Sequence, residues 1–217
     1  MSVAPKSLKL YQSNASPNSR RVRLFLSEKN LSVSIVPVDL GSKAQFSDAY
    51  RAINSRSQVP TLVLEDGTAI GEVPAIWRYL EEAFPEPPLL GKSPRDQALV
   101  TMWERRMELD GLAAAMEGVR NKSPGLRSRA LSGPHPYEQI PDLVTRSELR
   151  VRNFYSDLDS RLATVVFVAG DQFSAADITG LVTVDFATKG FGMPVPVTHL
   201  ALKRWYGMIC ARASSTA

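Results

Sequence analysis

Residues 58–72 read QVPTLVLEDGTAIGE, and this stretch decides the fold of the N-terminal half of the chain. Residues 61–64 are apolar and β-branched, as in a strand, and the Asp-Gly pair that follows is typical of a hairpin turn. Residues 68–71 then predict the returning strand. Pro60 stands at the first position of its strand, where a missing N–H is tolerated. The stretch therefore predicts a β-hairpin that begins at a proline.

The residues that flank this hairpin can bind an extended ligand and an anion. A proline at position 60 turns the backbone of Val59 outward, where its N–H and C=O groups can pair with an extended ligand. Residues 74–81 predict a helix, because apolar residues recur there at helical spacing. Glu72 falls at the N-terminus of that helix, beside free N–H groups that can hold an anion.

The composition is that of an ordinary globular protein, with 217 residues of which 44% are hydrophobic and 22% charged. The net charge is +4, and no basic cluster is interleaved with aromatic residues, which argues against a nucleic-acid partner. The densest basic run, Arg20, Arg21 and Arg23, is interpreted as a solvated helix face. A single cysteine excludes a disulfide framework and a zinc cluster. No segment resembles a secretory leader or a membrane span, so we expect no membrane association and a cytoplasmic location.

The elements before the hairpin complete a β-α-β-α-β-β-α order. They are a strand at residues 7–11, a helix at residues 20–28, a second strand of the buried parallel type at residues 31–38 and a second helix at residues 44–53. A loop rich in Ser, Asn and Pro joins the first strand to the first helix. No Cys-x-x-Cys pair accompanies this order, which argues against a dithiol oxidoreductase.

The C-terminal half is predicted to be helical. Residues 84–91 carry three prolines within four positions, which cannot continue a helix and favour a linker. Ser93 and Pro94 then start a long helix as N-cap and first helical residue. A Gly/Pro/Ser-rich loop is predicted at residues 121–141. Two further helices are predicted at residues 143–163 and 199–212. We expect a first domain over residues 1–83, a linker over residues 84–93 and a second domain over residues 94–217.

A capping box marks another helix start in this second half. Residues 170–178 read GDQFSAADI, in which Ser174 and Asp177 have the spacing of the box. Ser174 would accept a hydrogen bond from the Asp177 N–H, while the Asp177 carboxylate would accept one from the Ser174 N–H. Asp177 also meets the positive end of the helix dipole. Both residues are therefore predicted to be structural.

Together, Val59-Pro60, Glu72 and the capping box resemble the cytosolic glutathione transferases, especially the theta-like and zeta-like members. The resemblance implies an α/β thioredoxin-like N-terminal domain, an all-α C-terminal domain, a cis Val59–Pro60 bond and a homodimer. Residues 165–168, which alone would predict a strand, become an extended segment that enters the next helix. The implied activity joins the glutathione thiolate to a small hydrophobic electrophile, or uses the thiolate for peroxide reduction or isomerisation. Glutathione is then a co-substrate, and no metal is expected.

The resemblance also points to a residue that activates the thiol. A free thiol has a pKa near 8.5, so a hydroxyl that donates to the sulfur beside a helix N-terminus is needed to favour the thiolate. Alignment on Arg20-Arg21-Val22 places the family's catalytic serine at Ser16. Other candidates in the loop are Ser13, Asn14, Asn18 and Ser19. Ser16 and Ser19 also fit N-cap and turn roles.

The remaining glutathione contacts follow from the same resemblance. Gln45 would meet the glycyl carboxylate, Gln58 would face the peptide, the Val59 backbone would pair with the cysteinyl part, and Glu72 would accept from the γ-glutamyl amine. Val73 departs from the family, which has a serine there. This departure supports the alternative of a non-catalytic ligand- or protein-binding module with weak glutathione affinity.

An acceptor pocket between the domains is expected from residues on the long helix. The residues are Met102, Arg106, Met107 and Asp110. Methionines at this spacing also fit a plain helical core.

Overall fold

The predicted hairpin forms one side of a four-stranded sheet in the computed structural model, which describes residues 8–217. The strand order is β2-β1-β3-β4, with β1 and β2 parallel and the other neighbours antiparallel. The strands are β1 (Lys9–Gln12), β2 (Ser34–Pro37), β3 (Thr61–Val63) and β4 (Ala69–Ile70). Gly67 adopts a φ of 85° in the turn, which a glycine reaches without steric cost. Ser7, the predicted start of the first strand, lies outside the described residues.

The chain divides into two units. The first runs to residue 87 and includes residues 132–135 and 216–217, and the second comprises residues 88–131 and 136–215. The linker proposed over residues 84–93 spans this division.

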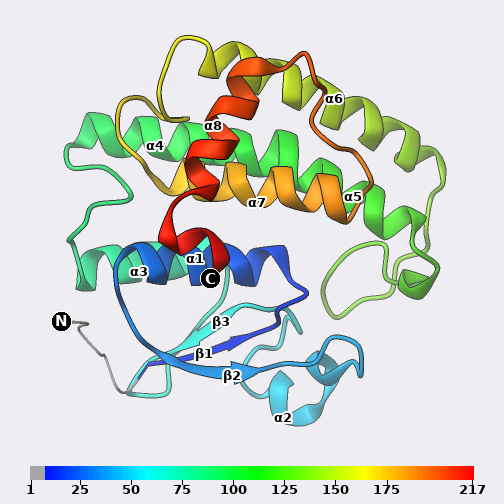
Figure 1. Cartoon of the computed structure of the whole chain (residues 1–217). Helices are drawn as coiled ribbons and strands as arrows, with labels where there is room; N and C mark the ends of the chain where they lie inside the picture. Colours follow the sequence, from blue (N-terminus) through cyan, green and yellow to red (C-terminus); the bar gives the residue numbers. More distant parts are fainter. Residues whose placement is uncertain (1–7) are drawn as a thin grey trace. The chain divides into compact units, whose positions relative to one another are not determined.

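In the first unit, two helices cover one face of the sheet, and a short helix lies on the other side (Figure 1). They are α1 (Pro17–Glu28) and α3 (Val73–Ala83) on the first face, and α2 (Asp48–Arg51) on the other. The predicted helix at residues 44–53 is broken, because Ser47 is extended and separates a 3₁₀ turn (Ala44–Phe46) from α2. Apart from this break, the β-α-β-α-β-β-α order is confirmed, and with it the thioredoxin-like fold.

Two expectations about burial in the first unit are wrong. β2 lies at the edge of the sheet and is mostly exposed, with Ile35 at 47% exposure, although its apolar sequence predicted a buried strand. Arg21 is fully buried instead of solvated. Its guanidinium lies 5.0 Å from the centre of the Trp77 ring, and it donates to Asn18 Oδ1 at 3.0 Å. A stacked guanidinium with hydrogen-bond acceptors can be buried in this way.

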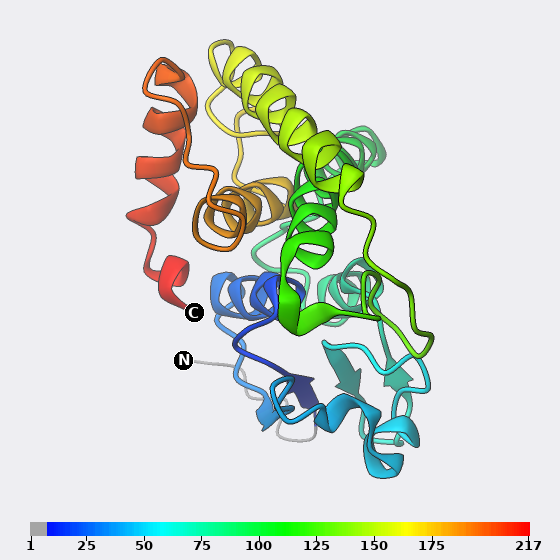
Figure 2. The same cartoon turned by 90° about the vertical axis from the view of Figure 1, so that its right-hand side faces the viewer.

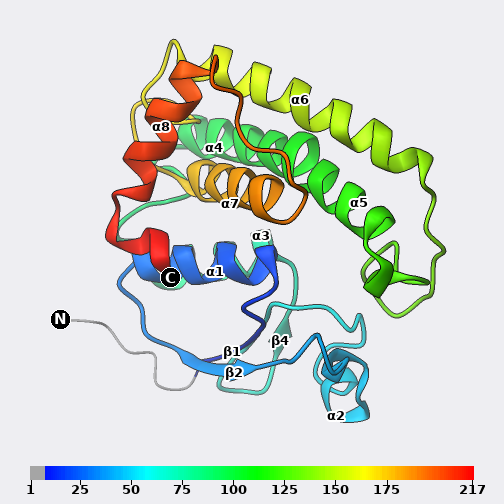
Figure 3. The same cartoon turned by 45° about the vertical axis from the view of Figure 1, so that its right-hand side comes forward.

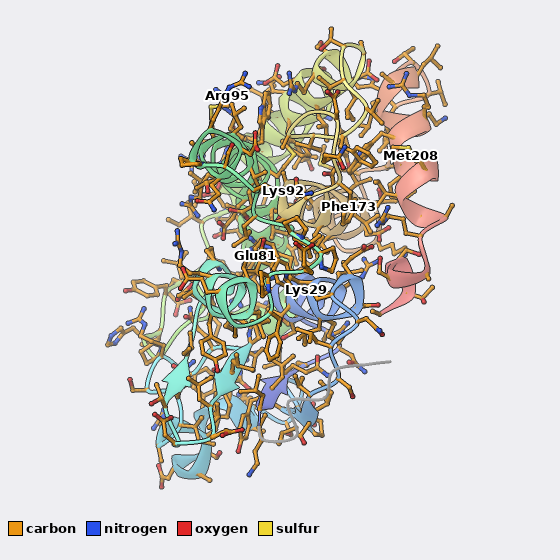
Figure 4. All side chains as sticks on the ribbon, turned by 90° about the vertical axis from the view of Figure 1, so that its left-hand side faces the viewer. Lys29, Glu81, Lys92, Arg95, Phe173 and Met208 are labelled. Carbon is orange, nitrogen blue, oxygen red and sulfur yellow. The ribbon has the colours of Figure 1, made fainter. Side chains whose placement is uncertain are left out.

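A buried ammonium group joins α1 to α3 and to the segment that follows. The Lys29 side chain is fully buried, and its Nζ lies 2.7 Å from the Glu81 carboxylate. It also donates to the carbonyls of Phe84 at 2.7 Å and Pro87 at 2.8 Å. Figure 4 shows Lys29 and Glu81 on their two helices. One ion pair and two hydrogen bonds thus compensate the buried charge of the lysine.

The second unit is helical throughout its described elements and is built around α7, which lies among the other helices (Figure 2). Most residues of α7 are buried, so its sequence is apolar on nearly all sides. The helices are α4 (Pro94–Arg106), α5 (Ala113–Lys122), α6 (Asp142–Leu162), α7 (Ala175–Lys189) and α8 (Leu200–Cys210). Residues 165–168 form no strand, and a bridge between Phe167 and Gly170 closes a tight turn there.

A π-helical segment joins α4 to α5 in one continuous rod, which Figure 3 shows beside α6. The segment is Met107–Leu112, and the sequence pattern did not predict it. Arg150 of α6 donates to the Leu109 carbonyl at 2.7 Å and so satisfies a backbone acceptor within the wider turn. Gly111 faces Phe154 so closely that an added Cβ would lie 2.7 Å from the ring. The segment is therefore packed on both sides and is not a frayed helix end.

The capping box is present at the start of α7. The Ser174 N–H donates to Asp177 Oδ2 at 3.0 Å, and the Ser174 hydroxyl caps the first turn. The other carboxylate oxygen of Asp177 accepts from the Val168 N–H and from Trp205 Nε1, both at 2.9 Å. Burial raises the pKa of Asp177 to about 6, although all these donors favour the carboxylate. One buried side chain thus connects α7 to α8 and to the preceding turn.

Candidate active site

The strand registers bring three predicted ligand contacts to one edge of the sheet. Thr61 pairs with Tyr11 of β1, so Pro60 falls beside Gln12, where the loop to α1 begins. Leu62 pairs with Ile70 of β4, so the same extrapolation sets Pro60 beside Glu72. The antiparallel ladders therefore gather the loop before α1, the Val59–Pro60 segment and the start of α3.

The Val59–Pro60 peptide bond is cis, as the family resemblance implied. Val59 is half-buried, and its backbone N–H and C=O find no hydrogen-bond partner in the described part of the chain. A buried or half-buried backbone normally has such partners. Val59 therefore offers one donor and one acceptor to an extended ligand.

Ser16 is the N-cap of α1 and is 8% exposed. Its hydroxyl accepts a hydrogen bond from the Ser19 N–H at 3.2 Å. Within residues 8–217 the hydroxyl proton has no acceptor, so it can still be donated to a ligand. The N-cap role and a thiol-binding role are thus compatible, because one uses the oxygen lone pair and the other the proton.

The other candidates in this loop mainly brace the loop itself. The fully buried Ser19 hydroxyl accepts from the Ser13 N–H at 3.3 Å. Asn18 Oδ1 accepts from Arg21, and Asn14 Oδ1 accepts from Gln12 at 3.0 Å. The Ser13 carbonyl accepts from the Ser16 N–H at 3.1 Å, so the Ser13 backbone also braces the start of α1. These contacts favour Ser16 as the thiol-binding hydroxyl.

The start of α3 combines a strained residue with free N–H groups. Glu72 is its N-cap, is exposed and has a φ of 63°, an unusual value for a residue other than glycine. The next residue, Val73, is buried, with 3% of its surface exposed. Pro74 has no N–H, and the Ile76 N–H bonds to the Glu72 carbonyl. The N–H groups of Val73 and Ala75 are left at the positive end of the helix dipole.

The two glutamines predicted to contact glutathione lie in different parts of the first unit. Gln45, in the 3₁₀ turn, is 7% exposed, and its Oε1 has no hydrogen-bond partner within the described residues. Gln58 donates from Nε2 to the Ser132 hydroxyl at 3.1 Å, and Ser132 belongs to the short loop that clusters with the first unit. Sequence reasoning missed Ser132, because nothing in the composition of the 121–141 loop indicates its partner.

The four predicted acceptor residues have different environments in the second unit. Met102 and Arg106 are exposed on α4, and Arg106 lies 4.6 Å from the centre of the Trp103 ring. Asp110 is exposed in the π-helical segment. Met107 is only 3% exposed, and a Cβ added at Gly180 would lie 3.6 Å from its sulfur. Met107 is therefore a core residue of this unit, and we assign it no acceptor role.

Neither histidine suggests a metal or proton-transfer site. His135 is exposed, and His199 lies 3.3 Å from the Ser156 hydroxyl. Over the described range, no three His, Cys, Asp or Glu side chains cluster as metal ligands would. None of the helices there is both long and apolar enough to cross a membrane.

Comparisons with known proteins show similarity to glutathione S-transferases. Residues 10–88 match the family profile described as glutathione S-transferase, N-terminal domain. The chain is 33% identical to glutathione S-transferase 2 of Saccharomyces cerevisiae, over 94% of this chain and 86% of the yeast protein. It is 31% identical to the maleylacetoacetate isomerase of Rattus norvegicus, over 78% of this chain and 73% of the rat protein. A crystal structure of a glutathione S-transferase domain-containing protein from Marinobacter aquaeolei is similar at 31% identity with a TM-score of 0.88, covering 95% of this chain and 99% of the other.

Proposed function

The chain belongs to the glutathione S-transferase family, and we propose that it joins the glutathione thiolate to a small hydrophobic electrophile, with the thiol held at Ser16. The observation that carries this proposal is the pair of free backbone groups of Val59 at the same sheet edge as the Ser16 N-cap. A transferase enzyme fits these features better than a non-catalytic binding module, because both the peptide-binding groups and a free hydroxyl proton are retained.

Glutathione is proposed to bind as an extra extended strand. Its cysteinyl backbone pairs with the N–H and C=O of Val59, as in β-strand addition. Its γ-glutamyl amine meets the Glu72 carboxylate, and its γ-glutamyl carboxylate meets the N–H groups of Val73 and Ala75. Its glycyl carboxylate approaches Gln45, whose amide N–H₂ group can donate to an anion.

The Ser16 hydroxyl then donates to the cysteinyl sulfur. A hydrogen bond to the charged form lowers the pKa of the thiol, and the positive end of the α1 dipole acts in the same direction. The thiolate attacks the electrophilic carbon of the acceptor, and the leaving group departs with its electron pair. The Ser19 N–H, in the first turn of α1, donates to the Ser16 oxygen, so the Ser16 hydroxyl proton points away from the helix.

The acceptor is proposed to contact Met102, Arg106 and Asp110 on α4 and the π-helical segment. Met102 offers an exposed, adaptable apolar surface, and Arg106 offers a cation already stacked on Trp103. An isomerisation that uses glutathione is the second candidate activity, since a relative at 31% identity is named maleylacetoacetate isomerase.

We also propose a homodimer in the cytoplasm with a role in detoxification. The family resemblance pairs the first domain of one subunit with the second domain of the other. Leu109 is an exposed apolar side chain along the α4–α5 rod and would be covered by such pairing. Analytical ultracentrifugation at micromolar concentration should give the dimer mass, and a monomer would remove this part of the proposal.

The first experiment is binding followed by turnover. The protein should be retained on immobilised glutathione and should conjugate glutathione to a general aryl halide such as 1-chloro-2,4-dinitrobenzene. Glutathione-dependent isomerisation of an unsaturated diacid should be measured in parallel. A protein that binds glutathione but turns over neither acceptor would leave the non-catalytic alternative as the better account.

A further inference from the structure

Two side chains of the first unit hold the carbonyl that precedes Val59. Tyr50 is a buried residue of α2, and its hydroxyl donates to the Gln58 carbonyl at 2.6 Å. Asn54 donates from Nδ2 to the same carbonyl at 3.1 Å. These are the two shortest hydrogen bonds to this oxygen, and the Thr61 hydroxyl lies 3.4 Å from it. The peptide group between Gln58 and Val59 is therefore held by side chains from eight and four residues earlier in the chain.

Thr61 closes this arrangement into a network. Its buried Oγ1 lies 3.0 Å from the Tyr50 hydroxyl and accepts from Asn54 Nδ2 at 2.8 Å. One assignment satisfies every donor. Tyr50 donates to Gln58, Thr61 donates to Tyr50, and Asn54 uses its two protons on Gln58 and Thr61. Burial raises the pKa of Tyr50 from its ordinary value, which favours the protonated hydroxyl that donates to Gln58. A closed network of this kind is more rigid than separate hydrogen bonds.

The held carbonyl determines where the Val59 N–H points. The Gln58–Val59 bond is not among the cis bonds of residues 8–217, so this peptide unit is trans and planar. In a trans peptide the C=O and the following N–H point in opposite directions. Because Tyr50 and Asn54 turn the Gln58 carbonyl inward, the Val59 N–H must face outward. No other described group holds that N–H.

We infer that Tyr50, Asn54 and Thr61 are positioning residues for glutathione, and that they act by orienting the Val59 N–H toward the ligand. This inference rests on the proposed function, in which Val59 pairs with the cysteinyl part of glutathione. The three side chains touch the Gln58–Val59 segment and not the thiol-binding Ser16. Their loss should therefore weaken the binding of glutathione and leave the chemistry of the bound thiolate unchanged.

The test is the Tyr50→Phe variant, which removes one hydroxyl and keeps the ring. The KM for glutathione should rise about three- to tenfold, as expected when one hydrogen bond no longer orders the binding group. The kcat at saturating glutathione, the KM for the aryl halide and the pH profile of kcat should stay within about twofold of wild type. Tyr79→Phe, the same change on α3 outside the network, is the matched control and should alter none of these quantities.

A second pair of variants keeps the test valid if Tyr50→Phe folds poorly. Thr61→Val preserves the shape but removes the hydroxyl, so it should raise the KM for glutathione. Thr61→Ser keeps the hydroxyl and should restore a KM close to that of wild type. An unchanged KM in both Tyr50→Phe and Thr61→Val would overturn the inference while leaving the proposed function intact. A kcat that falls with KM unchanged would also overturn it, and wild-type protein that fails to bind glutathione would overturn both.

Discussion

The replacement of Val73 by serine should strengthen glutathione binding, because position 73 is where this chain departs from its family. Val73 is the first residue of α3, and its backbone N–H lies at the positive end of the helix. A serine hydroxyl there can donate to the γ-glutamyl carboxylate. Hydrogen bonds to a charged group contribute roughly 1.5–3 kcal/mol, so affinity should rise by about tenfold or somewhat more.

The same substitution should lower the stability of the protein. The Val73 side chain is 3% exposed, so most of its apolar surface is lost from the core when serine replaces it. Full burial of a valine contributes about 1.5–3 kcal/mol, and the free energy of unfolding should fall by roughly 1–3 kcal/mol. Affinity and stability should therefore move in opposite directions, a combination that general loosening of the fold cannot produce.

Calorimetric titration with glutathione measures the first effect, and denaturant unfolding without glutathione measures the second. Val73→Ala is the control, because it removes methyl groups without adding a donor. If the alanine variant binds as tightly as the serine variant, the gain comes from relieved crowding and the hydroxyl argument fails. If wild type already binds tightly and serine adds nothing, another group holds the carboxylate.

Three further perturbations test the thiol, the capping box and the buried ion pair. Ser16→Ala should raise the pKa of the bound glutathione thiol, measured from the thiolate absorbance against pH, and should reduce kcat. Activity equal to that of wild type would assign thiol activation to another residue of the loop. Burial raises the pKa of Asp177 to about 6, so protonation of this side chain favours the folded state. This contribution to the free energy of unfolding is fully present below about pH 4 and is lost as pH rises through 6. Relative to Asp177→Asn, wild type should lose roughly 3 kcal/mol of unfolding free energy between pH 4 and 7, and parallel pH curves would contradict this. Lys29→Met leaves the Glu81 carboxylate without its buried ammonium and should cost about 3–5 kcal/mol in urea unfolding, whereas Lys9→Met on the exposed side of β1 should cost little.

Local patterns in the sequence predicted most elements, because those elements depend on neighbouring residues. The hairpin follows from a β-branched run and an Asp-Gly turn, and the α7 start follows from the spacing of Ser174 and Asp177. The Val59-Pro60 pair and Glu72 indicated the family and hence the thioredoxin-like fold, which the comparisons confirm.

The tertiary structure alone decided burial and long-range hydrogen bonding. β2 has an apolar sequence but lies at a sheet edge, and Arg21 is charged but buried, because burial depends on the neighbours that the fold supplies. The π-helical segment is held by Arg150, 41 residues away from the carbonyl it satisfies. The Gln58 carbonyl is held by Tyr50, a residue with no sequence motif of its own. A hydrogen bond between residues far apart in the chain leaves no periodic signal, so only the folded backbone could reveal these contacts.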